Sequence, residues 1–173
     1  MKIVLIIPQK DFKDETVVEL ITTFKKWKVE YAVASSTIGV CSGYHGAEIN
    51  ATINYSNIRS DEFDGIIISN GPGVEEYKLY NSRSLLDVIK FFNEKNKIIA
   101  CIGNSIKILS RANIINNKKI AMIKDLELTR LIKLFRGIIT DNLVEQDGNL
   151  ITASNSEKIN EFSKLIIEKL NLI

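Results

Sequence analysis

Short apolar runs alternate along the chain with longer segments of helical periodicity, and this alternation is the strongest constraint on the fold. Residues 15–27 and 82–94 place apolar side chains at the three- and four-residue spacing of amphipathic helices. The apolar runs lack a polar face, so both faces of each strand are expected to be covered. The runs are residues 3–7, 29–34, 65–69, 98–100 and 120–123. The pattern predicts an α/β flavodoxin-like three-layer sandwich, a mostly parallel sheet with helices on both faces.

The end of the chain shows a different pattern. Residues 143–145 and 150–153 flank the turn Gln146-Asp147-Gly148-Asn149, which is typical of a small β-hairpin. Asn155 then stands where a helix N-cap is expected, before an apolar stripe that continues to about Leu170. We therefore expect the sheet to end in a hairpin, followed by a final helix.

The length and charge of the chain restrict its class. A chain of 173 residues with 45% hydrophobic content is long enough for one compact domain over residues 1–173. The 23 basic and 21 acidic residues are scattered, so no basic stripe indicates nucleic acid binding. Two cysteines and one histidine provide neither a disulfide framework nor a zinc set. We expect no metal and no cofactor.

The amino-terminal run, residues 3–7, is too short for a signal peptide and is interpreted as the first buried strand. Elsewhere, Lys, Asp or Asn interrupts each apolar stretch before it reaches the length of a membrane span. Together with the scarcity of cysteine, this predicts a cytoplasmic protein with no membrane partner.

The stretch KIIACIGNSIKIL, residues 97–109, runs from strand character into helical spacing at Cys101. A sharp turn from strand to helix exposes its corner side chain at the carboxyl edge of the sheet, as in a nucleophile elbow. The helix N-terminus that follows would stabilise a thiolate. The alternative is a structural thiol buried at the end of a strand.

Three segments are expected to meet at that edge, because the carboxyl ends of parallel strands lie together. They are the loop of residues 8–15, the stretch Ser69 to Gly73, and Cys101 to Gly103. Gly71 lets its backbone approach a substrate closely, and backbone N–H groups of this loop and of Ile102 are candidate oxyanion donors. An ordinary strand-to-helix turn is the alternative.

FDGIIISNGPG, KIIACIGNS and the hairpin VEQDGNLITAS follow one another in the order found in the ThiJ/PfpI family, which the chain resembles. MKIVLII, FKDET, YAVASS and YHGAEI also match that order, so the resemblance covers nearly the whole chain. It implies the flavodoxin-like fold related to class I glutamine amidotransferases. The family includes intracellular cysteine proteases, deglycases, chaperones and redox sensors, and its members commonly form homodimers.

The resemblance also implies site residues. Cys101 matches the family's nucleophile and Gly103 the glycine that follows it. Many of the family's proteases place a histidine directly after the cysteine, where this chain has Ile102. A second family histidine is also missing, near Ile123.

The family acid that hydrogen-bonds the cysteine falls on Thr16 or on its neighbour Glu15, and the sequence leaves both open. Glu15 would carry the proton, whereas Thr16 would offer only a hydroxyl. Glu15 as an acid that stabilises its own helix N-terminus is equally consistent. His45, the one imidazole, is a possible base, although a surface position is the other interpretation.

These residues support a cysteine-dependent hydrolase, of the intracellular protease, amidase or deglycase type, acting on a small-molecule or peptide substrate. In it Cys101 attacks, the N–H groups near Gly71 and Ile102 hold the oxyanion, and Glu15 or water moves the proton. The alternatives are a non-enzymatic thiol sensor of oxidative stress and a degenerate member that binds a small molecule.

Overall fold

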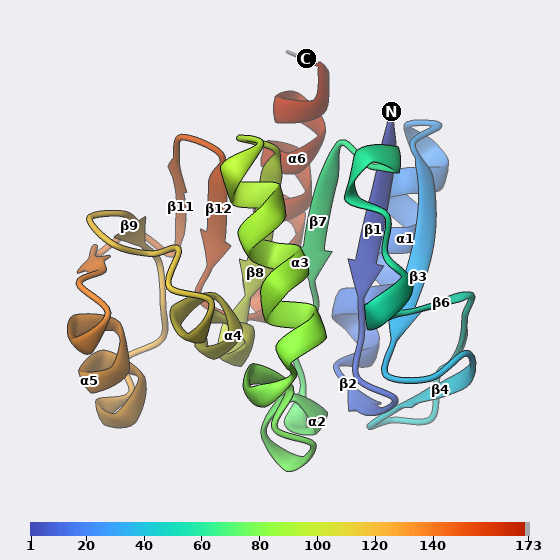
Figure 1. The fold of residues 1–173 in the computed structure, drawn as a ribbon, viewed down its shortest axis with the longest axis horizontal. Helices are drawn as coiled ribbons and strands as arrows, with labels where there is room; N and C mark the ends of the chain where they lie inside the picture. Colours follow the sequence, from blue (N-terminus) through green and yellow to red (C-terminus); the bar gives the residue numbers. More distant parts are fainter. Residues whose placement is uncertain (172–173) are drawn as a thin grey trace.

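The computed structural model describes residues 1–171, and a seven-stranded sheet forms its centre (Figure 1). The strands lie in the order β11-β12-β8-β7-β1-β3-β6, and β11 is the antiparallel edge strand. Their bounds are β1 Lys2–Ile6, β3 Glu30–Ser35, β6 Ile53–Asn54, β7 Gly65–Ile68, β8 Ile98–Ile102, β11 Val144–Asp147 and β12 Leu150–Ala153. The predicted parallel sheet and terminal hairpin are confirmed.

Helices cover both faces of this sheet, in the layered arrangement that its two-sided apolar strands require. On one face, helices α3 (Arg83–Glu94), α4 (Ile106–Arg111) and α5 (Leu126–Leu134) contribute Leu85, Leu109 and Ile132 to one buried cluster. On the other face, α1 (Asp14–Lys26) and α6 (Ile159–Asn171) contribute Phe24 and Phe162 to a second cluster.

Local capping explains where several helices begin. The Ser82 hydroxyl accepts a hydrogen bond from Leu85 N at 3.5 Å at the start of α3, and Asp125 accepts one from Leu128 N at 2.8 Å at the start of α5. Asn155 caps the short 3-10 helix η5 (Ser156–Lys158), which leads into α6. The terminal helix therefore begins as predicted, with one 3-10 turn before its α-helical part.

The predicted strand at residues 120–123 is much shorter and lies outside the central sheet. Only β9 (Lys119–Ile120) is extended, and it pairs with β10 (Ile138–Ile139) in a separate two-stranded sheet. The reason is visible at Ala121, whose N–H donates to the side-chain oxygen Oγ1 of Thr152 in β12 at 2.9 Å rather than to a backbone carbonyl oxygen of a strand. Residues 120–122 are buried without becoming part of the main sheet, and Ile123 is exposed.

Several shorter elements complete the molecule. A three-stranded sheet lies beside the end of β1, and helix α2 (Pro72–Glu76) follows β7. The strands of the small sheet are β2 (Lys10–Phe12), β4 (Gly39–Gly43) and β5 (Glu48–Ala51), and the remaining 3-10 turns are η1 (Tyr55–Asn57), η2 (Ser60–Glu62), η3 (Leu79–Asn81) and η4 (Gly103–Ser105). The small sheet, α2 and η4 lie at the carboxyl end of the parallel strands, whereas η2 precedes β7 at their amino end.

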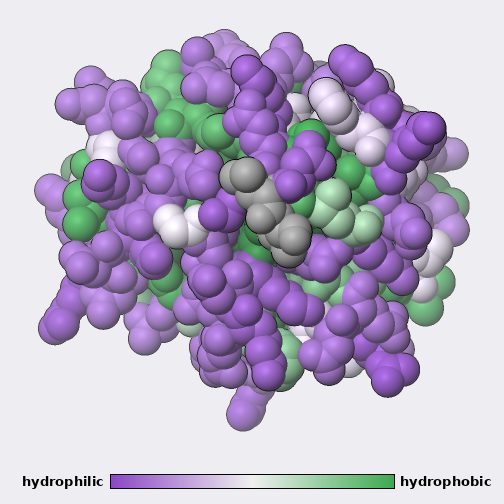
Figure 2. Space-filling model, turned by 90° about the horizontal axis from the view of Figure 1, so that it is seen from above, coloured by the Kyte–Doolittle hydropathy of each residue, from purple (hydrophilic) through white to green (hydrophobic). Residues whose placement is uncertain are grey.

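Figure 2 shows the opposite end of the molecule, where the parallel strands begin and both termini lie in Figure 1. Hydrophilic residues cover most of that face, and its apolar areas are small and separated. Within residues 1–171, no helix combines the length and the apolar composition needed to cross a membrane. Ligands of open α/β sheets bind at the other end, outside the carboxyl ends of the strands.

Candidate functional site

The corner between β8 and the following helix is occupied by Gly103, not by Cys101. Strand β8 continues through Ile102, and Gly103 then turns the chain with φ +61°. This left-handed conformation favours glycine because a side chain there is strained. The expectation that Cys101 is exposed at the corner is therefore wrong, because the corner lies two residues later in the chain.

Cys101 lies within the strand and is only 1% exposed. Burial raises the pKa of its thiol well above the usual range, although a hydrogen bond with Ser105 acts in the opposite direction. The thiolate that nucleophilic attack requires is therefore disfavoured at neutral pH. Cys41, the second thiol, is also fully buried, and burial raises its pKa as well.

The side chain of Cys101 also points to the face of the sheet away from α1. It packs in the buried cluster with Ile99 beneath α3 and α4, whereas Ala100 and Ile102 belong to the cluster beneath α1 and α6. This follows from the two-residue period of a strand. Residues at the start of α1 therefore do not share a face with the thiol.

The structure distinguishes the two candidates on α1. Thr16 is fully buried, whereas the Glu15 side chain is 56% exposed and lies 3.4 Å from Lys13 Nζ. Glu15 is therefore a surface acid in the first turn of its helix, where it complements the helix dipole. Thr16 is the residue that faces the interior.

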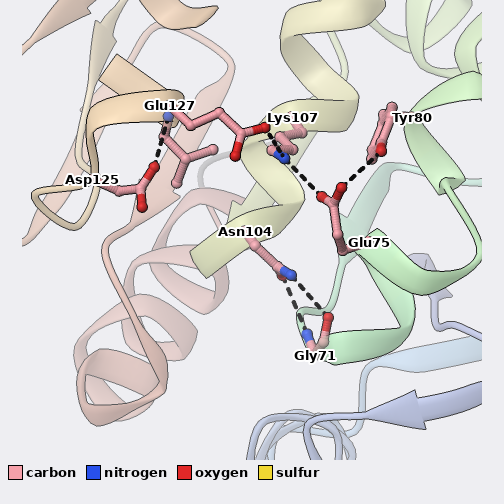
Figure 3. A network of polar contacts seen from close by, with 8 residues as sticks. Gly71, Glu75, Tyr80, Asn104, Lys107, Asp125 and Glu127 are labelled. Atoms are coloured by element: carbon pink, nitrogen blue, oxygen red, sulfur yellow. Dashed lines mark hydrogen bonds and ion pairs between the residues drawn. The ribbon is translucent and has the colours of Figure 1, made fainter. Parts of the chain in front are cut away.

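The two expected oxyanion donors already have partners inside the protein. Ile102 N donates to Ser105 Oγ at 3.2 Å, and Gly71 N donates to Asn104 Oδ1 at 3.3 Å. The Asn104 amide completes the second pair by donating to the Gly71 carbonyl oxygen at 2.8 Å (Figure 3). Donors engaged in this way are not preorganised for a developing oxyanion.

The loop after β7 packs tightly between the first loop and the corner. Lys13 N donates to the Asn70 carbonyl oxygen at 2.8 Å, and a Cβ on Gly71 would collide with the Asp11 carbonyl oxygen. Glycine is thus required at position 71 by close backbone approach, as expected. The close neighbour is the protein's own backbone.

His45 lies in the exposed turn between β4 and β5. Its backbone N–H donates to Asp14 Oδ1 at 2.8 Å, and its ring stands edge-on to Tyr44 with 5.1 Å between centroids. Ala47 N donates to the other oxygen of the same carboxylate at 2.8 Å. These contacts give the turn a structural role, to hold β4 and β5 above the start of α1.

Four buried polar atoms have no hydrogen-bond partner within the described residues; three belong to residues directly after strands β7 and β12, and the fourth lies in the first turn of α1. They are Thr16 Oγ1, Ser69 Oγ, Asn70 Oδ1 and Ser154 Oγ. Because buried polar groups are normally satisfied, each of these atoms can take a hydrogen-bond partner from outside the chain, an ordered water or a ligand. A polar residue directly after an apolar strand is the sequence pattern that marks Ser69, Asn70 and Ser154, and Ser154 is not among the site residues predicted from it.

A cavity of about 910 Å³ opens beside the end of β12. Ser154 follows Ala153, which is paired with Ile102 of β8, so the cavity lies next to the Gly103 corner. Its lining combines apolar and uncharged polar side chains with few charges: Met122, Ile123, Lys124, Asp125, Leu126, Thr129, Ile139, Thr140, Asp141, Asn142, Leu143, Ser154 and Asn155. Its volume is within the range of small-molecule sites.

A charged network fixes the helices around the corner (Figure 3). Lys107 Nζ lies 2.7 Å from Glu75 Oε2 on α2 and 2.9 Å from Glu127 Oε1 on α5. Tyr80 donates to the other Glu75 oxygen at 2.9 Å. The network joins four elements and leaves Lys107 with a structural role.

Within residues 1–171, no group of three His, Cys, Asp or Glu side chains is suited to hold a metal ion.

Comparisons with known proteins agree with this architecture. The model of the DJ-1/PfpI family matches residues 1–169. An uncharacterized protein of Methanocaldococcus jannaschii is 33% identical over 90% of this chain and 76% of its own length. A deglycase of Pyrococcus abyssi is 31% identical over 67% of this chain and 69% of its own length.

Solved structures show the same fold. A ThiJ/PfpI domain protein from Brachyspira murdochii superimposes with a TM-score of 0.93 at 23% identity, covering 99% of this chain and 97% of that one. Drosophila melanogaster DJ-1beta gives a TM-score of 0.85 at 18% identity, covering 98% and 89%.

Proposed function

Because the chain belongs to the DJ-1/PfpI family, we propose that it keeps the family's fold as a small-molecule-binding protein and does not use a cysteine nucleophile. The observation that carries the proposal is Gly103 at the corner, with Cys101 buried two residues earlier in β8. A corner without a side chain has no group to attack a carbonyl. The hydrogen bonds already made by Ile102 N and Gly71 N support the same conclusion.

The unpartnered polar atoms support binding rather than simple loss of function. In a site that had lost its function, buried polar groups without partners would be expected to be replaced by apolar or hydrogen-bonded ones. The reason is that each unsatisfied buried group lowers the free energy of unfolding by about 1–3 kcal/mol. This chain instead keeps four such atoms at the edge where α/β sheets hold their ligands. Uncharged hydroxyl and amide groups suit an uncharged polar group on the ligand.

Thiol chemistry is the competing function, either as the cysteine hydrolase implied by the resemblance or as a redox sensor. Both require a thiol that is accessible and readily ionised. The burial of Cys101 and Cys41 and the raised pKa of each argue against both forms. Two Pyrococcus relatives are named deglycases, and this proposal does not extend that activity to the present chain.

The test is alkylation of the native protein with iodoacetamide at pH 8, with each cysteine followed by peptide mass spectrometry. We expect Cys101 to react at least 100-fold more slowly than in the unfolded chain. The double variant Asn70→Ala/Gly103→Cys, which puts a thiol at the corner, should react rapidly at residue 103. Alkylation of native Cys101 at the unfolded rate would contradict the proposal.

A second arm measures hydrolysis of p-nitrophenyl acetate and consumption of methylglyoxal by the wild type and by Cys101→Ser. We expect no turnover that depends on Cys101. A tenfold or greater loss of either activity in the variant would restore the cysteine-hydrolase hypothesis.

We also propose that the chain is a single domain and a cytoplasmic homodimer with no nucleic acid partner. The homodimer and the location rest on the family resemblance and on the small number of cysteines. Sedimentation velocity at micromolar concentration tests the homodimer, and a single monomer boundary would exclude it.

A further inference from the structure

Resting on the proposed function, we propose that the cavity beside β12 binds an uncharged, largely apolar small molecule with one hydrogen-bonding group, which Ser154 recognises. The cavity lies between the start of α5, the chain of residues 139–143 and the end of β12. Its volume of about 910 Å³, open on one side to solvent, has room for a molecule of one to three rings. The site is adjacent to the Gly103 corner and does not include Cys101.

The lining determines the class of ligand. Apolar side chains come from several elements, among them Met122, Ile139 and Leu143, and they supply contact area without charge. The charged groups at the wall are Lys124, Asp125 and Asp141, and they bring no excess of positive charge. Asp125 is already engaged, because it accepts the Leu128 N–H at 2.8 Å. Nothing in this set favours a phosphate or a carboxylate over a neutral molecule.

Ser154 supplies the specific polar contact. The residue lines the cavity but is only 1% exposed, and its hydroxyl has no partner within the described residues. Its backbone is fixed, because Ser154 N donates to the Leu143 carbonyl oxygen at 2.8 Å. Its hydroxyl can turn between staggered positions toward a ligand without breaking an existing hydrogen bond. A ligand carbonyl or hydroxyl would satisfy it.

A small molecule and a second copy of the chain are the two occupants to compare for this cavity. Leu126 and Leu143 are 67% and 50% exposed at the rim, so a second copy of the chain is the other occupant to consider. The unpartnered hydroxyl in the wall favours the small molecule, since an apolar contact between copies would leave it unsatisfied.

The test is fluorescence titration with prodan, a neutral naphthalene that carries one carbonyl group and shifts its emission to the blue in an apolar site. We expect saturable binding at one site per chain. Ser154→Ala should weaken binding about fivefold to tenfold by removing the hydrogen bond. Thr129→Trp, which places a large ring in the cavity from α5, should abolish binding.

Ser110→Ala is the matched control, because Ser110 is also a fully buried serine but lies in α4 outside this cavity, where its hydroxyl donates to the Ile106 carbonyl oxygen. It should leave prodan binding unchanged. Equal weakening by Ser110→Ala and Ser154→Ala, or no effect of Thr129→Trp, would overturn the assignment of the cavity. Absence of prodan binding with a dimer that Thr129→Trp dissociates would assign the surface to a second copy instead.

These outcomes are distinct from failure of the proposed function, which is decided by the reactivity of Cys101. An inert thiol with no prodan binding would remove only this inference. A reactive thiol would remove the proposed function whether or not prodan binds.

Discussion

The Asn70 side chain lies directly against Gly103, at the corner where a nucleophile would project. A Cβ at position 103 would lie 2.8 Å from Asn70 Nδ2 and 3.1 Å from Asn70 Cβ. The corner therefore has no side chain, and one at position 103 would require the Asn70 side chain to shift. The loop after β7 and the turn after β8 therefore pack directly against each other.

This contact predicts that Gly103→Ala is destabilising. The substitution combines a left-handed backbone angle with the close contact to Asn70, and we expect a loss of about 1–3 kcal/mol in the free energy of unfolding. Urea denaturation measures the loss. In the Asn70→Gly background the same substitution should cost less, because only the backbone strain remains. Equal costs in both backgrounds would exclude the steric part.

Burial of Cys101 predicts how stability depends on alkaline pH. Burial raises the pKa of this thiol in the folded state. The neutral thiol's contribution to the free energy of unfolding is therefore fully present below the unfolded pKa of about 8.5. It is lost as pH rises above that value, because the unfolded chain then ionises more readily than the folded one. Wild type should therefore lose more stability between pH 7 and pH 10 than Cys101→Ala does. Chemical denaturation at the two pH values gives the difference, and parallel pH profiles would contradict it.

The carboxylate of Asp14 predicts a loss of stability in acid. Burial alone raises the pKa of this carboxyl group, but the hydrogen bonds from His45 N and Ala47 N outweigh it and lower the pKa overall. A lowered pKa stabilises the folded state above the unfolded value of about 3.9, and the contribution is lost as pH falls through that region.

Asp14→Ala should therefore cost about 1–2 kcal/mol at pH 7, by leaving two backbone N–H groups without their acceptor. The difference between variant and wild type should shrink toward pH 3. Asp61→Ala, at an exposed acid in the 3-10 turn η2, is the control and should have little effect at either pH. A cost for Asp14→Ala that does not depend on pH would contradict the assignment.

The Lys107 network predicts unequal effects of its two acids. Glu75 bonds both Lys107 and Tyr80, and its side chain is 53% exposed, whereas Glu127 bonds Lys107 and is 77% exposed. Glu75→Gln should therefore cost about 1 kcal/mol and Glu127→Gln about half as much or less. Thermal or urea unfolding of the two variants measures the order. A larger cost for Glu127→Gln would contradict it.

Much of the candidate site could be located from the sequence, but the orientation of its residues could not. The segments after β1, β7 and β8 do lie at one edge, because parallel strands align their carboxyl ends. The sequence also showed the glycine that the close approach at position 71 requires. By contrast, Ser154 and the cavity beside it depend on how β12, α5 and the chain of residues 139–143 pack together. These segments lie within residues 122–155, but the sequence pattern does not show how they fold against one another.

The apolar runs by themselves determined the layered α/β fold, because segments apolar on both faces must be covered on both sides. Only the tertiary structure decided that β8 continues to Ile102 and that the chain turns at Gly103. A run that is apolar on both faces contains no alternation to mark which side chain points where, or where the strand ends. Pairing with β7 and β12 fixes both, through Ile68 opposite Cys101 and Ala153 opposite Ile102. That register buries the thiol and leaves the corner to glycine.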